Sequence, residues 1–222
     1  MSGMTVVDYF DDVYGRFDRF WGNGIAWRYS TDPDDYPTSL ISQTVFRIAG
    51  SRKPGPVLDL GAGEGLDAIR LARLGYRVHA VEASSVGAAK IRRFAAEMGV
   101  VVDVEVCDVR DFRFGTEYEF IICNGLLHYI ADKEPLIRRM QQATAPGGYN
   151  VISTWSTFTP VPECHGNIPA YCDDEEGVIR SRYRHWVTEL VYFERDKLET
   201  SHQNLPSHRH SFIKLIAKKP GP

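Results

Sequence analysis

Short apolar segments alternate with longer amphipathic segments through the middle of the chain. The apolar segments span residues 57–60, 77–82, 100–107, 118–123 and 150–155. Such runs are typical of strands buried in a parallel sheet, whereas the segments between them carry apolar residues at the three- and four-residue spacing of helices. The pattern therefore predicts an α/β fold with helices on both faces of a mostly parallel sheet.

Helices are predicted over residues 6–21, 40–49, 66–74, 85–98 and 130–145, and a short helix is predicted to begin at the acidic run 173–176. Residues 183–194 and 208–218 read as a closing pair of strands. Adding this pair gives a Rossmann-like seven-stranded sheet whose final strand is antiparallel. We expect residues 1–50 to form an N-terminal helical lid and residues 51–222 to form the α/β domain, as one structural unit overall.

A glycine-rich turn connects the first predicted strand to the helix that follows it. Gly61, Gly63 and Gly65 permit the positive φ angles of a tight strand-to-helix turn and let a ligand approach the backbone. A dinucleotide-binding turn would have its third glycine where Leu66 stands, and the charge of Glu64 would repel a diphosphate. A ligand without phosphate and with positive charge, such as S-adenosylmethionine, fits this turn better.

Residues 57–65, Val-Leu-Asp-Leu-Gly-Ala-Gly-Glu-Gly, resemble motif I of the class I S-adenosylmethionine-dependent methyltransferases. The resemblance implies that the glycine turn cradles the methionine end of the cofactor. Glu82 ends the second strand about 20 residues after the turn, where an acidic residue is expected to bind ribose hydroxyls. By the same resemblance Asp108 and Val109 contact the adenine. The expected cofactor-binding residues are Asp59, Gly61, Ala62, Gly63, Glu82, Ala83, Asp108, Val109 and Asn124.

Two stretches look like the tellurite-resistance methyltransferase family, whose members methylate tellurium and selenium oxyanions. These are residues 147–152, which follow the Pro-Gly turn, and the ending 212–219. That family carries a histidine-arginine pair before its final hairpin, and the corresponding position here reads His202-Gln203. The arginine is therefore missing, and Arg209 is a hypothetical substitute. Because an oxyanion needs fixed positive charge, this departure favours a small organic acceptor.

The resemblance places the methyl acceptor beside the carboxyl ends of the fourth and fifth strands. We predict His128 and His202 as catalytic residues, either of which would serve as a base for a hydroxyl or a protonated amine. The residues predicted to bind substrate are Tyr9, Arg28, Tyr29, Trp155 and Arg209. The predicted reaction is in-line methyl transfer to a thiol, amine or hydroxyl of a metabolite, with the oxyanions as the alternative. A nicotinamide-dependent oxidoreductase and a non-catalytic S-adenosylmethionine-binding protein are more distant alternatives.

Composition narrows the class of partner further. The net charge of −3, with 43% hydrophobic and 25% charged residues, is that of an ordinary globular protein and favours a small-molecule substrate over nucleic acid. No apolar run is long enough to cross a membrane, so we expect a cytoplasmic protein without membrane contact. Cys164-His165 with Cys172 matches no zinc-binding spacing, and we predict no metal. The acceptor atom and the oligomeric state remain open.

Overall fold

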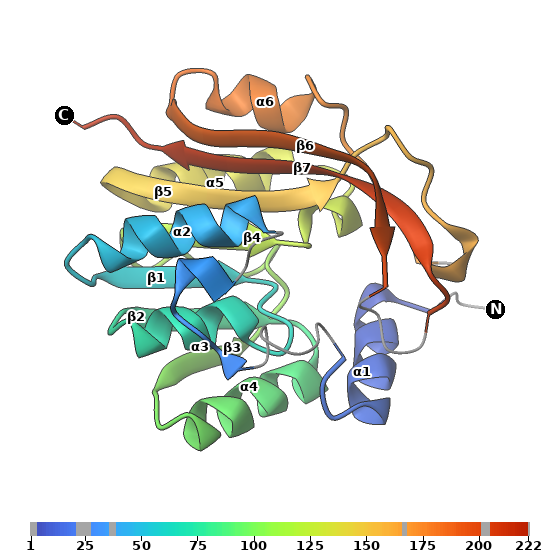
Figure 1. The fold of residues 1–222 in the computed structure, drawn as a ribbon, viewed down its shortest axis with the longest axis horizontal. Coiled ribbons are helices and arrows are strands. Elements are labelled where there is room, and N and C mark those ends of the chain that lie inside the picture. The colour runs from blue at the N-terminus through green and yellow to red at the C-terminus, as the bar shows by residue number, and fades with distance from the viewer. Residues whose placement is uncertain (1–3, 21–27, 36–38, 166–167, 201–204, 222) are drawn as a thin grey trace.

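A computed structural model describes residues 4–20, 28–35, 39–165, 168–200 and 205–221 (Figure 1). Within these residues, seven strands form one sheet in the order β3-β2-β1-β4-β5-β7-β6. The strands are β1 (Pro56–Leu60), β2 (Arg77–Glu82), β3 (Val102–Val106), β4 (Tyr118–Asn124), β5 (Thr144–Trp155), β6 (Val187–Glu199) and β7 (His208–Lys218). The helices are α1 (Val6–Arg16), α2 (Leu40–Gly50), α3 (Leu66–Arg73), α4 (Ser85–Glu97), α5 (Glu134–Ala143) and α6 (Val178–Tyr183).

The sheet is parallel from β3 to β5 and antiparallel at β7 and β6. This arrangement confirms the predicted Rossmann-like fold with an antiparallel final strand. The chain order reverses between β1 and β4, which are hydrogen-bonded neighbours. In open α/β sheets, ligands bind at the carboxyl ends of the strands beside this reversal, so the topology alone locates the site.

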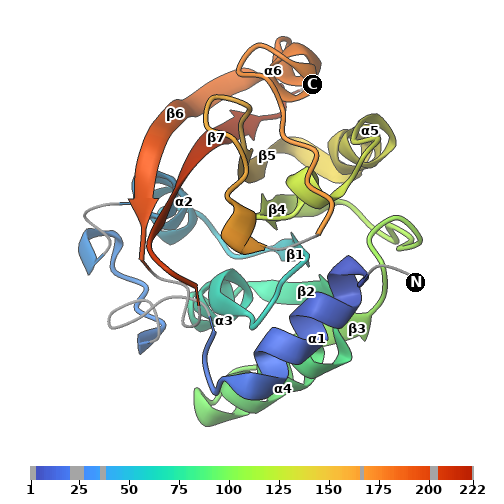
Figure 2. The same cartoon turned by 90° about the vertical axis from the view of Figure 1, so that its right-hand side faces the viewer.

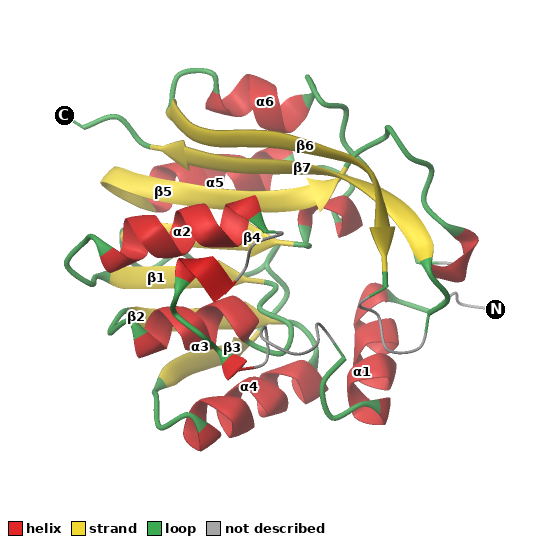
Figure 3. Ribbon diagram, in the orientation of Figure 1, coloured by secondary structure: helices red, strands yellow, loops and turns green. Residues whose placement is uncertain are grey.

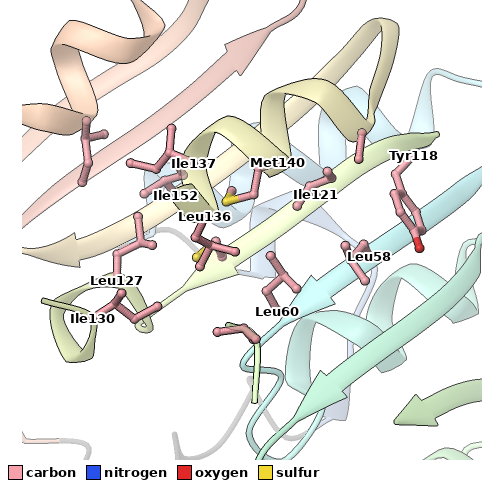
Figure 4. Packing of buried hydrophobic residues seen from close by; sticks show 14 of the residues in the cluster. Leu58, Leu60, Tyr118, Ile121, Leu127, Ile130, Leu136, Ile137, Met140 and Ile152 are labelled. Carbon is pink, nitrogen blue, oxygen red and sulfur yellow. The ribbon is translucent and has the colours of Figure 1, made fainter. Parts of the chain in front are cut away.

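Alternating side chains of the central strands supply two separate cores. Leu58, Ile121 and Ile152 point to the face covered by α5 and α6, and part of this core is drawn in Figure 4. Their neighbours Val57 and Phe120 point to the opposite face, which α2 and α3 cover. Because both faces are buried, the strands read as continuous apolar runs in the sequence, and each fully buried side chain contributes about 1.5–3 kcal/mol.

Several predicted boundaries differ from the observed ones. The first helix ends at Arg16 rather than at residue 21, and α5 begins at Glu134 rather than at residue 130. β5 begins at Thr144, before the Pro-Gly-Gly turn, because the chain pairs with β4 across a register shift. The acidic run 173–176 precedes α6 instead of opening it. Asp173 caps that helix by accepting hydrogen bonds from the amides of Val178 and Ile179.

The two N-terminal helices have different positions. α1 lies at the end of the sheet where the parallel strands finish, beside α4, as Figures 1 and 2 show together. α2 instead packs on the sheet, with Ile41 and Phe46 buried in the second core. β6 and β7 form a long hairpin that curves beyond the end of β5 toward α1 (Figure 3). Among the described residues up to 50, α1 has the position of a lid and α2 does not. The division into a lid over residues 1–50 and a domain over residues 51–222 stays a prediction.

Candidate functional site

A cavity of about 610 Å³ opens at the carboxyl ends of the parallel strands. Cavities of roughly 300–1,000 Å³ are typical for cofactor and small-molecule sites. One end is lined by the glycine turn and by the ends of β2, β3 and β4, and the other by the ends of β5, β6 and β7. Nine predicted cofactor residues line it, namely Asp59, Gly61, Ala62, Gly63, Glu82, Ala83, Asp108, Val109 and Asn124. The structure thus brings this predicted set together, and its role in binding remains a proposal.

The glycine turn uses its own amides inside the fold. The amides of Gly61 and Ala62 both donate to the carbonyl of Val81, at 2.8 and 3.1 Å, and the amide of Gly63 donates to Glu82 at 2.7 Å. Gly61 and Gly63 have φ angles of 65° and 58°, which only glycine adopts without strain. Because a diphosphate needs free amide donors, a turn whose first three amides are occupied suits a ligand without phosphate.

Glu64 stabilises the protein instead of repelling a ligand. Its side chain is buried, with Oε1 2.7 Å from Nζ of Lys90, and both oxygens accept a hydrogen bond from the amide of Phe20. The lysine neutralises the carboxylate charge that the sequence analysis set against a diphosphate. That argument was therefore wrong, and the occupied amides of the turn replace it.

Glu82 is held at the centre of the cofactor end. Its Oε2 accepts from the amide of Gly63 at 2.7 Å, and its Oε1 accepts from the amide of Ser84 at 2.8 Å. Burial raises the pKa of Glu82 to about 7, although both amide hydrogen bonds favour the ionised form. Each carboxylate oxygen retains a lone pair, so Glu82 can still accept hydrogen bonds from the hydroxyls of a ribose.

A second buried carboxylate lies beside the glycine turn. Burial raises the pKa of Asp59 well above its usual range, and the nearby charges of Asp67 and Glu82 raise it further. Asn124 holds Asp67 in place by donating from Nδ2 at 3.0 Å. A cation beside these carboxylates would stabilise the ionised form of Asp59. The sulfonium and ammonium groups of S-adenosylmethionine fit this end of the cavity.

Asp108 and Val109 close the cofactor end after β3. Asp108 is bound by Arg110, whose backbone amide and Nε both donate to Oδ1 at 2.9 Å and whose Nη2 donates to Oδ2 at 2.6 Å. This hydrogen bonding lowers the pKa of Asp108, so its carboxylate remains an acceptor. The buried side chain of Val109 lies next to it in the cavity wall. An acceptor beside an apolar surface is what an adenine amino group and ring require.

Aromatic rings form the wall at the other end of the cavity. The indole of Trp155 lies between two imidazoles, 4.0 Å from the ring of His128 with an interplanar angle of 12°, and 4.4 Å from the ring of His210 at 18°. The amide of Trp155 donates to Nδ1 of His128 at 3.4 Å. Burial and the neighbouring histidines lower the pKa of His128 well below its usual range, so its imidazole is neutral. Trp155 and His128 thus both line the cavity, and their roles toward a methyl acceptor stay predictions.

Four residues predicted to bind substrate lie outside the cavity lining. The ring of Tyr9 packs edge-on against Phe10, and Phe10 lines the cavity in its place. Tyr29 is buried in a small cluster with Ile69 and Phe94, and its hydroxyl accepts from Nη1 of Arg19 at 3.0 Å. Arg28 is exposed. None of these three side chains is among the described cavity-lining residues, so the structure does not support their predicted contact with substrate.

Arg209 also points away from the cavity. Its side chain is 53% exposed, and its Nη1 donates to the carbonyl of Asp196 at 2.5 Å. Alternation along β7 explains this placement, because His208 and His210 on either side of Arg209 point to the opposite face. Arg209 therefore does not substitute for the missing arginine. The predicted catalytic residue His202 lies outside the described residues.

The structure adds cavity residues that the sequence analysis did not single out. Phe10 and Tyr14 reach the cavity from α1, and Lys197 and Lys214 reach it from the curved hairpin. Helical spacing marked the two aromatic residues only as a buried face of α1. The lysines carried no signal, because which side chains of β6 and β7 face the cavity depends on the curvature of the hairpin beyond β5.

A family model described as "Tellurite resistance protein TehB" matches residues 29–208, which is most of the chain. The chain belongs to the TehB family. This confirms the resemblance to the class I S-adenosylmethionine-dependent methyltransferases that the glycine turn and the last strands suggested, together with the cofactor that the resemblance implied.

Individual relatives of this TehB-family chain carry different names. Hemagglutinin 1 of Eikenella corrodens is 32% identical over 187 residues, covering 82% of this chain and 59% of the relative. The probable S-adenosyl-L-methionine-dependent methyltransferase TehB of Haemophilus influenzae is 25% identical, covering 83% of this chain and 64% of the relative. The chain therefore spans about three fifths of the length of these curated relatives.

Solved structures share the fold. The crystal structure of TehB from Haemophilus influenzae superposes with a TM-score of 0.66 at 22% identity, over 84% of this chain and 65% of that chain. Magnesium protoporphyrin IX methyltransferase from Synechocystis, with bound S-adenosylhomocysteine, superposes with a TM-score of 0.65 at 20% identity, over 96% of this chain and 97% of that chain.

In the part of the chain that the structure describes, no helix has the length and apolar character needed to cross a membrane.

Proposed function

We propose that this chain transfers the methyl group of S-adenosylmethionine to a small organic acceptor, a thiol, amine or hydroxyl of a metabolite. The observation that carries the proposal is the division of one cavity into a carboxylate-lined end and an end lined by aromatic rings and histidines. When bound, S-adenosylmethionine supplies a sulfonium methyl for in-line displacement. Asp59 and Glu82 would hold the cofactor, and Trp155 would align an acceptor and exclude water.

The charges at the acceptor end favour an organic acceptor over an oxyanion. Lys214 is buried and its Nζ lies 2.6 Å from Oε2 of Glu194. Lys197 lies 3.7 Å from the same carboxylate and 3.8 Å from Glu199. The positive charge of each lysine is therefore balanced by glutamate, and the one arginine among the described lining residues, Arg110, is bound to Asp108. Among the lining residues that the structure describes, tellurite or selenite would find no uncompensated positive charge of the kind that an oxyanion requires.

The hydrogen bonding of His128 narrows the acceptor further. Because the amide of Trp155 donates to Nδ1, the proton of the neutral imidazole belongs on Nε2. His128 then acts as a hydrogen-bond donor that orients the acceptor, and not as the base predicted from the sequence. A nucleophile that ionises without help needs no base. Among thiols, amines and hydroxyls, this arrangement favours a thiol that reacts as its thiolate.

The first experiment measures cofactor binding by calorimetry with S-adenosylmethionine, S-adenosylhomocysteine and NAD. We expect binding of the two sulfur compounds, loss of binding in Glu82→Ala, and wild-type affinity in the control Glu105→Ala, which changes a half-exposed glutamate on the edge strand β3. Binding of NAD alone would identify an oxidoreductase and reject the proposal. If none of the three compounds binds, both the methyltransferase and the oxidoreductase would be rejected.

The second experiment identifies the acceptor through the release of S-adenosylhomocysteine. The panel contains thiols, primary amines, phenols, tellurite and selenite. We expect faster turnover with thiols than with the other compounds of the panel. Turnover with the oxyanions alone would support the alternative that the family's name suggests and would overturn the organic acceptor. Cofactor binding without turnover on any compound would support a non-catalytic binding protein.

The cytoplasmic location and the absence of a nucleic-acid partner stay predictions.

A further inference from the structure

Three histidine side chains meet at one point beside the acceptor end of the cavity. Nε2 of His165 lies 3.0 Å from Nε2 of His208 and 2.8 Å from Nε2 of His210, and the last two atoms are 2.9 Å apart. His208 and His210 alternate along β7 and so share one face of the strand. His165 comes from a short 3-10 turn, Glu163–His165, which is 43 and 45 residues away along the chain.

Hydrogen bonds among these three nitrogens cannot account for the arrangement. A ring nitrogen of a neutral imidazole either carries a proton and donates or carries a lone pair and accepts, but it does not do both. In a triangle of three such atoms, at least one pair must therefore consist of two donors or two acceptors. Protonation of the rings would add repulsion between like charges. A cation bound by three lone pairs removes this conflict.

The protonation of His208 suits a metal ligand. Its Nδ1 lies 2.7 Å from the carbonyl oxygen of Pro206, to which it donates. In a neutral imidazole the lone pair is then on Nε2, the atom that faces His165 and His210. A backbone carbonyl that fixes the tautomer and the ring orientation in this way is a common partner of metal-binding histidines.

A cysteine completes the set of ligand atoms. Sγ of Cys164 and the ligand atoms of His165 and His208 all lie within 4.8 Å of one another. We propose that Cys164, His165, His208 and His210 form a tetrahedral site for a divalent transition metal of the zinc class. One thiolate and three imidazoles are ligands that Zn²⁺ prefers. Metal–nitrogen bonds of about 2.0–2.1 Å place tetrahedral nitrogens about 3.3 Å apart, so the observed triangle needs to expand by a few tenths of an ångström.

Sequence spacing alone did not reveal this site. The sequence analysis paired Cys164 and His165 with Cys172 and predicted no metal, whereas the structure brings in His208 and His210 from the last strand. Cys164 and His165 lie next to His208 and His210 because β7 curves beyond the end of β5 and because the segment after β5 folds back over β7. Four protein ligands leave no open position, so the site is structural. It would fasten the turn 163–165 to β7 and fix His210 against Trp155 in the cavity wall.

The test measures metal binding by untagged protein and does not depend on methyl transfer. Protein stripped with a chelator is titrated with Zn²⁺ and, separately, with Co²⁺ as a spectroscopic probe. We expect one ion per chain, release of the Cys164 thiol proton, and a thiolate-to-Co²⁺ charge-transfer absorption. Elemental analysis of the protein as purified gives the same stoichiometry. Metal removal should lower the thermal midpoint. A folded wild-type protein that binds neither ion would overturn the proposal, whatever the outcome of the cofactor experiments.

Variants assign the ligands. His165→Asn and His208→Asn should weaken binding by more than about 100-fold, and Cys164→Ser should abolish the charge-transfer absorption. The controls are Cys172→Ser, which changes a cysteine outside the cluster, and His185→Asn, which changes an exposed histidine, and both variants should bind metal like wild type. Unchanged stoichiometry and spectra in the two histidine variants would contradict this ligand set. If either histidine variant fails to fold, metal binding by His210→Gln and by the wild type provides the same test.

Discussion

Glu64 and Lys90 form a buried ion pair that joins the glycine turn to the segment after α1. The carboxylate and ammonium atoms are 2.7 Å apart, and the side chains are 0% and 10% exposed. Lys90 also donates to the carbonyl of Phe17, while the amide of Phe20 donates to both carboxylate oxygens of Glu64. The cofactor turn and the N-terminal segment are therefore fixed to each other by one charged pair.

Breaking this pair should cost far more than breaking an exposed one. We expect Lys90→Met to lower the free energy of unfolding by about 3–5 kcal/mol, because it removes the ammonium group from the buried carboxylate of Glu64. The control Arg93→Met changes an exposed residue of α4, the helix that also carries Lys90, and removes its ion pair with Asp18. It should lower the free energy of unfolding by about 0–1 kcal/mol. Urea unfolding measures both. The double variant Lys90→Met with Glu64→Gln should recover part of the loss, and equal losses in the single and double variants would contradict this account.

The titration of Glu82 should make the stability of the ligand-free protein depend on pH. Burial raises the pKa of Glu82 from 4.5 to about 7, so the folded state binds more protons than the unfolded state between these values. Its contribution is fully present below about pH 4.5 and is lost as the pH rises through about 7, by up to about 3 kcal/mol. Glu82→Gln should remove the Glu82 part of this slope and leave the contributions of Asp59 and His128. Unfolding free energies measured from pH 5 to 8 provide the comparison.

The same residue should give cofactor binding the opposite pH dependence. Ribose hydroxyls donate to a carboxylate, and the ionised form of Glu82 is the better acceptor. We expect the affinity for S-adenosylhomocysteine to rise several-fold between pH 6 and 8 in the wild type. In Glu82→Gln the affinity should be weaker and nearly independent of pH. Calorimetry at three pH values tests this, and an affinity that falls with rising pH would reject the assigned role.

The cofactor end could be predicted from the sequence because its residues follow strands directly. Gly61, Glu82 and Asp108 each stand at the carboxyl end of a parallel strand, and such ends meet at one edge of a sheet. Local pattern was therefore enough to place them together. The partner of Glu64 was not predictable in this way, because its interaction with Lys90 depends on how α4 packs against the turn.

The acceptor end could be predicted only in part. Trp155 and His128 follow parallel strands and were found by the same rule. His165 and His210 come together through a long hairpin and a returning loop, whose curvature leaves no local signal in the sequence. Arg209 was misplaced because a shift of one position along a strand reverses the face to which a side chain points.

Buried side-chain hydrogen bonds that link α6 to β5 should make a measurable contribution to the stability of the protein. The hydroxyl of Tyr183 donates to Oδ1 of Asn150 at 2.6 Å, and Nδ2 of Asn150 donates to Oγ1 of Thr144 at 2.7 Å. Tyr183→Phe removes the partner of a buried amide oxygen and should lower the unfolding free energy by about 1–3 kcal/mol. The control Tyr192→Phe changes a residue that is 37% exposed and should change the unfolding free energy by less than about 0.5 kcal/mol. Similar losses in both variants would show that the network contributes little.

The stacked rings at the acceptor end should affect methyl transfer without affecting cofactor binding. Trp155 stacks on His128 and on His210, and each aromatic pair contributes about 0.5–1.5 kcal/mol beyond area burial. We expect Trp155→Ala to lower kcat/KM for the acceptor by about tenfold or more, since both imidazoles lose their packing surface. Trp155→Phe should retain part of the activity. The affinity for S-adenosylhomocysteine should stay within about twofold of the wild type in both variants, because the carboxylate-lined end is untouched. A loss of cofactor affinity that parallels the loss of kcat/KM would instead mean that Trp155 supports the whole cavity and has no specific role at the acceptor end.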